Sequence, residues 1–143
     1  MAAVMCPAIP DGPARLDHVT IAAADLDASL PLYDAALTAL GLQRQHELGD
    51  EEEDDAATEA VGYGAEEGDA LLWLVSGTPP TRSVHVSFRA GSREAVQRFH
   101  DAAVAAGGAS HDAPRRWTLY RRGDFYAIVR DLDGNLIEAV AEE

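Results

Sequence analysis

Three side chains of this sequence, two imidazoles and one carboxylate, have types and positions that suit the binding of a divalent metal ion. His18 begins the run His-Val-Thr-Ile, and His85 begins the similar run His-Val-Ser-Phe. Glu138 stands in the apolar run Leu-Ile-Glu-Ala-Val, where a charge is costly unless it has a partner. Two histidines and one acid that leave coordination positions open form a facial triad for divalent metals, and a similar set serves catalytic zinc.

The two histidine runs belong to a longer internal similarity, which indicates a duplicated unit. When His18 is aligned with His85, each copy continues from a β-branched run into a helical run that ends at Gly41 or Gly108. A duplicated unit predicts a pseudo-twofold core in which equivalent positions face each other. We therefore expect the two histidines to approach one another. The same alignment places Trp73 opposite Glu138, and because an indole is no metal ligand, these four positions supply at most three ligands.

The order of elements that must position these residues is the same in both halves. Each half is predicted to contain a strand, a helix and three further strands, so the fold class is α+β. The arrangement expected is two tandem βαβββ modules that form a curved mixed sheet around a cleft, with the helices outside. We expect a single domain, with module one at about 14–77, module two at about 82–141, and an acidic loop at 49–56.

Local signals give more detailed expectations for the helices and for one strand. The first helix is predicted to begin near Asp27 or Ser29, because Pro31 is tolerated only in a first turn. Ser92 is predicted to cap the second helix, and residues 117–121 are predicted to form a strand. Alternation along the strands places His18 and His85 on the face opposite the one that packs on the helices.

Composition excludes several classes of function. The formal net charge of −14 opposes binding to a phosphate backbone, which needs basic patches. No run approaches the roughly 18 apolar residues of a membrane span. The single cysteine, Cys6, cannot form an internal disulfide, and the first residues lack the basic and apolar pattern of a signal peptide. We expect a cytoplasmic protein that binds neither nucleic acid nor a membrane.

The chain resembles the vicinal oxygen chelate superfamily, which includes glyoxalase I, extradiol dioxygenases, and fosfomycin and bleomycin resistance proteins. The resemblance rests on the two histidine runs and on the closing segment 125–140, Phe-Tyr-Ala-Ile-Val-Arg-Asp-Leu-Asp-Gly-Asn-Leu-Ile-Glu-Ala-Val. It implies paired βαβββ modules, one divalent metal ion in the cleft and a homodimer. Its ligand positions fall on His18, His85 and Glu138. Fe, Zn, Mn, Ni and Co are not distinguishable as the metal.

Departures from the family pattern restrict the activities that the resemblance implies. Glyoxalase I has a further acidic ligand at the position of Trp73, so lactoylglutathione lyase activity is not expected. The candidate catalytic residues are Glu138 and Tyr120, because extradiol dioxygenases add a second-sphere tyrosine. The candidate substrate-binding residues are Trp73, Tyr126 and Arg121.

The sequence therefore supports two main functions and a third. The first is a metal-dependent enzyme, a lyase, isomerase or oxygenase, that acts on a small oxygen-bearing organic substrate. The second is a non-catalytic protein that sequesters a drug or metabolite between aromatic side chains, as bleomycin resistance proteins do. The third is a regulatory or structural member of the family whose cleft is filled.

Overall fold

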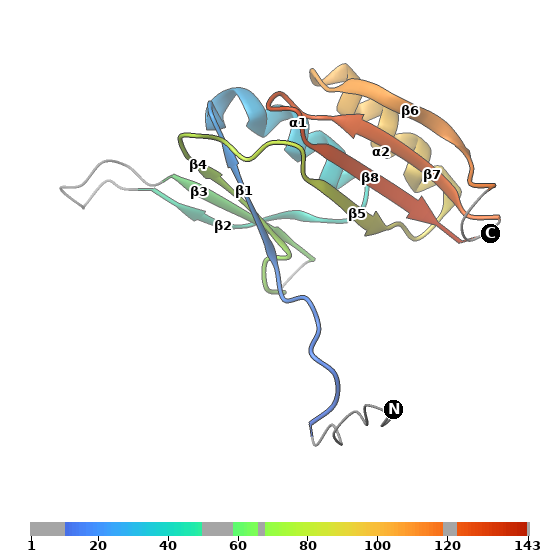
Figure 1. The fold of residues 1–143 in the computed structure, drawn as a ribbon, viewed down its shortest axis with the longest axis horizontal. Coiled ribbons are helices and arrows are strands. Elements are labelled where there is room, and N and C mark those ends of the chain that lie inside the picture. The colour runs from blue at the N-terminus through green and yellow to red at the C-terminus, as the bar shows by residue number, and fades with distance from the viewer. Residues whose placement is uncertain (1–10, 50–58, 66–67, 119–122, 143) are drawn as a thin grey trace, which may run out of the picture.

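The computed structural model describes residues 11–49, 59–65, 68–118 and 123–142. These residues form eight strands and two helices (Figure 1): β1 (Val19–Ala23), α1 (Leu26–Thr38), β2 (Gln43–Leu48), β3 (Ala60–Gly64), β4 (Leu72–Ser76), β5 (His85–Arg89), α2 (Arg93–Ala105), β6 (Ala109–Arg116), β7 (Phe125–Arg130) and β8 (Leu136–Ala141). Neither helix in these ranges has the length and hydrophobicity needed to cross a membrane. The acidic residues expected to form a loop lie almost entirely outside the described residues.

The strands form two mixed four-stranded sheets with the same topology, one in each half of the chain. Their orders are β1-β4-β3-β2 and β5-β8-β7-β6. The first strand of each half pairs in parallel with the last, and the other pairs are antiparallel. The predicted α+β class and the βαβββ order are confirmed. The registers also agree with the sequence alignment, because Thr20 pairs with Trp73 as Ser87 pairs with Glu138.

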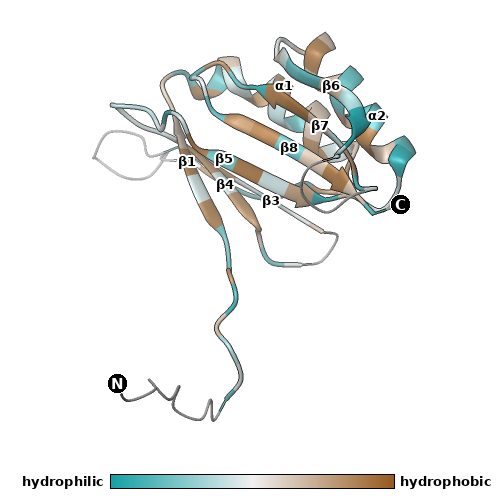
Figure 2. Cartoon of the chain, turned by 45° about the vertical axis from the view of Figure 1, so that its right-hand side comes forward, coloured by the Kyte–Doolittle hydropathy of each residue, from teal (hydrophilic) through white to brown (hydrophobic). Residues whose placement is uncertain are grey.

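One hydrophobic core joins the two halves. It includes residues of both helices and of both sheets, among them Leu37, Leu74, Phe99 and Ile137. The two helices contact each other, and α2 also contacts β6, β7 and β8. Hydrophobic residues concentrate on the central strands, whereas β6 is largely hydrophilic (Figure 2). The histidine-bearing face of β5 is exposed while its other face meets the core, as the alternation predicted.

The first helix begins earlier than predicted. It starts at Leu26, and the carboxylate of Asp25 caps it by accepting the backbone N–H of Ala28 at 3.1 Å. Pro31 therefore lies beyond the first turn, where its missing N–H costs one helical hydrogen bond. Ser92 caps α2 as predicted, with its Oγ accepting the backbone N–H of Ala95.

The strand predicted at residues 117–121 is wrong in its described part. The strand that pairs with β7 is β6, at Ala109–Arg116, and Trp117 lies outside it. The sequence did not indicate β6 as a strand, because this segment has no apolar alternation and contains Pro114. As an edge strand with register shifts, β6 tolerates a proline that a central strand would not.

A buried polar network holds the two modules together. The hydroxyl of Tyr33 on α1 donates to Oδ2 of Asp131 at 2.6 Å, and the side-chain amide of Asn135 donates to the same oxygen at 3.0 Å. Asn135 also donates to the carbonyl of Thr81 and accepts the backbone N–H of Val84. The turn before β8 is thereby fixed to α1 and to the segment that joins the modules.

Candidate functional site

The structure brings two of the three predicted metal ligands together. Nε2 of His85 lies 2.8 Å from Oε1 of Glu138. The parallel register of β5 and β8 produces this contact, because Ser87 pairs with Glu138 and His85 precedes Ser87 on the same face. The glutamate side chain is only 15% exposed, so the imidazole supplies a polar partner that offsets its burial.

These two side chains line a cavity of about 270 Å³ on the exposed face of the second sheet. The cavity walls combine titratable groups with two aromatic rings and come from β5, β7, β8 and the segments next to β6 and β7. The lining residues are His85, Ser87, Trp117, Asp124, Tyr126, Glu138 and Val140. This set has the composition of a small-molecule site, in which apolar walls carry a few polar groups.

His18 is not part of this cluster. Its Nδ1 lies 2.7 Å from Oδ1 of Asp17, and its side chain is 46% exposed. Across the described residues, no three His, Cys, Asp or Glu side chains come close enough to hold one metal ion. One chain therefore presents His85 and Glu138 as a pair, with His18 elsewhere at the start of β1.

Trp73 lies on the first sheet, at the position equivalent to Glu138. Its ring stacks on the ring of His46, with centroids 5.6 Å apart and an angle of 22° between the planes. Gly62 on the neighbouring strand makes room for the indole, because a Cβ there would lie 3.0 Å from the ring. Trp73 does not line the cavity with His85 and Glu138, so one chain does not bring it to their site.

Tyr126 lines the cavity and is held by polar contacts at its hydroxyl. Nε of Arg115 donates to this oxygen at 2.8 Å, and the hydroxyl donates to Oδ2 of Asp112 at 3.2 Å. Burial raises the pKa of Tyr126, and the nearby Asp112 charge acts in the same direction, against the opposing effect of Arg115. The ring of Trp117 meets that of Tyr126 edge to face, with centroids 4.9 Å apart. Together the two rings form a fixed aromatic wall.

Trp117 and Asp124 line the cavity, although neither is among the site residues predicted from the sequence. Trp117 was predicted only as part of a strand. The hydrogen bond from Trp117 N to the carbonyl of Asp124, at 2.6 Å, sets both beside Tyr126. The candidate residues Tyr120 and Arg121 lie outside the described residues.

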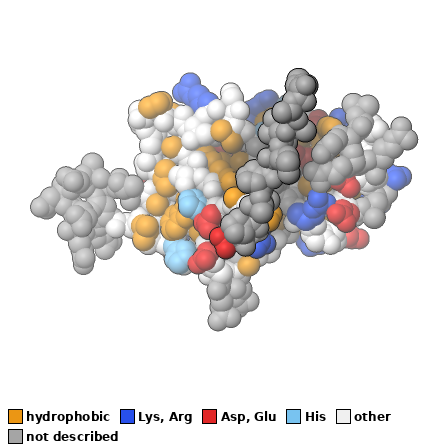
Figure 3. Space-filling model, turned by 60° about the horizontal axis from the view of Figure 1, so that its bottom comes forward, with side chains coloured by type: hydrophobic (Ala, Val, Ile, Leu, Met, Phe, Trp, Pro, Cys, Tyr) orange, Lys and Arg blue, Asp and Glu red, His pale blue; other side chains and the backbone are white. Residues whose placement is uncertain are grey.

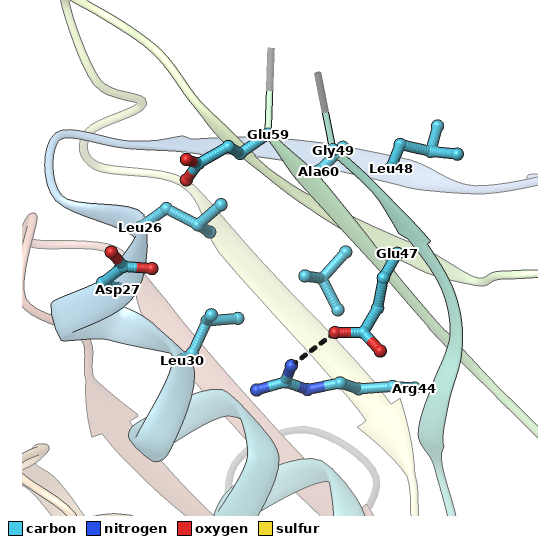
Figure 4. A pocket seen from close by; sticks show the side chains of 10 residues that line it. Leu26, Asp27, Leu30, Arg44, Glu47, Leu48, Gly49, Glu59 and Ala60 are labelled. Atoms are coloured by element: carbon cyan, nitrogen blue, oxygen red, sulfur yellow. Dashed lines mark hydrogen bonds and ion pairs between the residues drawn. The ribbon is translucent and has the colours of Figure 1, made fainter. Parts of the chain in front are cut away.

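A second cavity, of about 380 Å³, lies between α1, β2 and β3 and contains none of the predicted site residues (Figure 4). Its Arg44 is already engaged: it donates to Oε1 of Glu47 at 2.9 Å and to both carboxylate oxygens of Asp34. Burial alone raises the pKa of Asp34, but the hydrogen bonds from Arg44 and Tyr63 outweigh it and hold that pKa below its usual value. The contacts between Arg44 and Asp34 connect β2 to α1.

A comparison of the sequence with known protein families agrees with the observed strand topology. A family model described as the Glyoxalase/Bleomycin resistance protein/Dioxygenase superfamily matches residues 15–139. The chain belongs to this superfamily. A comparison with curated proteins gives no significant match.

Solved structures with the superfamily's fold cover nearly all of the chain. A glyoxalase/bleomycin resistance protein from Albidiferax ferrireducens is 26% identical, with a TM-score of 0.69 over 89% of this chain and 98% of that chain. A fosfomycin resistance protein from Listeria monocytogenes is 15% identical, with a TM-score of 0.63 over 92% and 96%. A glyoxalase I mutant from Zea mays is 17% identical, with a TM-score of 0.63 over 88% of this chain and 44% of that chain. The last two show similarity of fold alone.

The spacing of His85 and Glu138 suits two ligands of one divalent ion. Bonds of about 2.1 Å at right angles place neighbouring ligand atoms about 3 Å apart. The 2.8 Å between Nε2 of His85 and Oε1 of Glu138 is close to this separation. Histidine and acidic side chains also lie next to hydrophobic ones on the face seen in Figure 3.

Proposed function

We propose that this protein is a metal-dependent enzyme that acts on a small oxygen-bearing organic substrate, with one divalent ion held by His18, His85 and Glu138. The observation that carries the proposal is the 2.8 Å approach of His85 to Glu138 in the wall of an aromatic-lined cavity. Membership of the superfamily supports it, because glyoxalases and dioxygenases belong to the same family. Whether the reaction is that of a lyase, an isomerase or an oxygenase stays open.

We further propose that the active form is a homodimer in which His18 of one chain joins His85 and Glu138 of the other. Within the described residues, β1 and β5 pair with a neighbour on one side only, and open strand edges are often covered by a partner. Residues 11–18 are exposed and extend away from the sheets (Figure 1), so His18 stands where a second chain can reach it.

We assign the following roles to the residues of the site. A divalent ion held by His18, His85 and Glu138 would supply Lewis acidity for an oxyanion that develops on the substrate. Trp117 and Tyr126 hold the apolar part of the substrate against the ion-binding pair. Glu138 acts as ligand and catalytic residue, with Tyr120 as the second candidate for the chemistry. Arg121 and Trp73 stay candidates for contacts to the substrate.

Metal analysis tests the ligands directly. Protein purified without chelators is expected to contain close to one divalent ion per chain, and Glu138→Gln is expected to lose it. Glu47→Gln is the matched control, because it removes the same charge from a residue that lies in the other cavity. A Glu138→Gln protein that keeps the metal content of the wild type would refute the ligand assignment.

Mixing two inactive variants tests the shared site. His18→Ala and Glu138→Gln are each expected to bind no metal as homodimers. Unfolded and refolded together, they form mixed dimers in which one site keeps all three side chains, so the mixture is expected to recover metal binding. If each site lay within one chain, mixing would restore none. Analytical ultracentrifugation of the wild type checks that the dimer exists.

The alternative function is sequestration of a drug or metabolite without chemistry. It is favoured by a specific observation: the wall of the cavity combines Trp117 and Tyr126, and the first sheet carries Trp73 where the second carries Glu138. Metal analysis also separates the two functions. A wild-type protein that takes up none of Fe, Zn, Mn, Ni or Co, yet changes its tryptophan fluorescence with a small aromatic ligand, would be a binding protein.

A further inference from the structure

The cavity beside His85 contains a carboxylate to which neither the family resemblance nor the proposed metal site gives a role. Asp124 immediately precedes β7 and is only 9% exposed. Its backbone carbonyl accepts the N–H of Trp117, but its carboxylate has no hydrogen-bond or ion-pair partner among the residues that the structure describes. The carboxylate oxygens are not among the polar atoms shut off from solvent, so they are open at the cavity wall, where a donor on a ligand can bind them.

A second polar group of the same cavity also lacks a partner. The indole Nε1 of Trp117 is buried, and within the described ranges it meets no acceptor. This N–H is shut off from solvent, so the carboxylate of Asp124, and not the indole N–H, is open to a ligand. A buried polar group left without its hydrogen bond destabilises a protein, and most such groups are satisfied in native structures.

The charges around the cavity favour a cation. Asp124 adds a negative charge beyond the proposed ligand pair, and neither Arg nor Lys is among the lining residues that the structure describes. Arg115 turns to the hydroxyl of Tyr126 and, with Arg116, lines a neighbouring cavity on Trp117. The net charge of −14 adds a long-range attraction for cations.

The aromatic wall supports the same ligand class. Trp117 and Tyr126 are fixed edge to face, and the faces of such rings attract ammonium groups. We propose that the cavity recognises a small organic molecule that carries a protonated amine, which Asp124 binds. This substrate class rests on the proposed function only in taking the cavity as the substrate site.

The test compares three ligands of the same skeleton by isothermal titration calorimetry: tyramine, with a protonated amine; tyrosol, with a neutral hydroxyl; and 4-hydroxyphenylacetate, with a carboxylate. A charge-assisted hydrogen bond predicts that wild-type protein binds tyramine about tenfold more tightly than tyrosol, and 4-hydroxyphenylacetate most weakly. Equal affinities for the three ligands, a preference for the carboxylate, or no detectable binding of tyramine would overturn the inference.

Variants connect the preference to the residue. Asp124→Asn keeps the shape of the side chain and is expected to abolish the tenfold preference for tyramine while leaving the affinity for tyrosol nearly unchanged. Glu142→Gln removes one negative charge from an exposed ion pair with Arg89 outside the cavity, and is expected to keep the preference. An Asp124→Asn protein with the wild-type preference would refute the assignment. If both variants lost the preference, the overall charge and not Asp124 would be responsible, which would also refute it.

The same titrations on chelator-treated protein separate this inference from the metal proposal. Asp124 is not one of the proposed ligands, so amine selectivity is expected with and without metal, and Asp124→Asn is expected to keep the metal content of the wild type. Amine selectivity in a protein that takes up no metal would refute the enzyme proposal alone. Metal uptake without amine selectivity would refute the inference alone.

Discussion

Replacing Tyr33 by Phe tests the buried network that joins the two modules. The substitution removes one hydroxyl and keeps the ring, which is 1% exposed and packs in the core. The lost hydrogen bond is the 2.6 Å contact to Oδ2 of Asp131, which leaves that oxygen with the 3.0 Å contact from Asn135. Because the acceptor is a buried carboxylate, water does not readily replace the hydroxyl. The variant should therefore be clearly less stable than the wild type.

The magnitude follows from the type of bond. A hydrogen bond to a charged group contributes about 1.5–3 kcal/mol, so Tyr33→Phe should lower the free energy of unfolding by about 2 kcal/mol. For a chain of this size, that loss corresponds to a fall of about 4–8 °C in the melting temperature. Urea unfolding at pH 7, followed by circular dichroism, measures it. Burial, together with Asp131, raises the pKa of Tyr33, so its hydroxyl stays protonated at that pH.

The matched control is Tyr63→Phe. Tyr63 is as buried as Tyr33, and its hydroxyl donates to Oδ1 of Asp34 at 2.7 Å. The side chain of Asp34 is 38% exposed and keeps its two hydrogen bonds from Arg44, so water can take the place of the lost hydroxyl. We expect a loss of about 1 kcal/mol or less. Equal losses in the two variants, or a loss below about 0.5 kcal/mol for Tyr33→Phe, would show that the network does not hold the modules together.

Three further substitutions test local features. Burial raises the pKa of Asp34, but hydrogen bonds from neighbouring side chains, above all Arg44, hold it below its usual value. The ionised carboxylate therefore stabilises the fold above about pH 4. In urea unfolding, the stability advantage of the wild type over Asp34→Asn should shrink as the pH falls below that value. Gly62→Ala should cost about 1–3 kcal/mol and shift the tryptophan fluorescence, because the new Cβ would press on the Trp73 ring; an unchanged spectrum would contradict this. Gly41→Ala should cost about 1 kcal/mol in thermal unfolding, because Gly41 has a φ of +82° at the end of α1 and only strain, not a clash, opposes the alanine.

Periodicity and duplication were enough to predict most of the fold. The two helices, the strand order and the register that makes Trp73 equivalent to Glu138 follow from repeated patterns of apolar residues. The errors fall where tertiary context overrides local preference. Asp25 caps α1 ahead of the predicted start, so Pro31 lies beyond the first turn of a helix that the core packing holds in place. Strand β6 forms without apolar alternation because it pairs on one side only and its side chains are largely exposed.

The candidate site was predicted only in part, for two physical reasons. Glu138 was detectable because a lone acid in an apolar strand needs a partner, and the partner found, His85, was also predicted. Asp124 and Trp117 were not detectable, because their contact depends on how the β6–β7 connection folds back, which no periodic pattern encodes. His18 was expected to approach the pair but lies apart from it in one chain, because no local pattern in the sequence encodes how the two sheets meet.

The two modules keep one backbone and have diverged in the side chains that cross their exposed faces. In the first sheet the row of paired residues reads His46, Gly62 and Trp73; in the second the equivalent row ends in Glu138. The indole is accommodated because Gly62 lacks a Cβ, and it stacks on the ring of His46. A substitution of Trp73 by Glu would place an acid beside this glycine and histidine. The same pairing of first and last strands would bring the new carboxylate next to His18, as it brings Glu138 next to His85. The duplication thus retains the geometry for two acid–histidine pairs, and the side chain at position 73 decides that only one of them is formed.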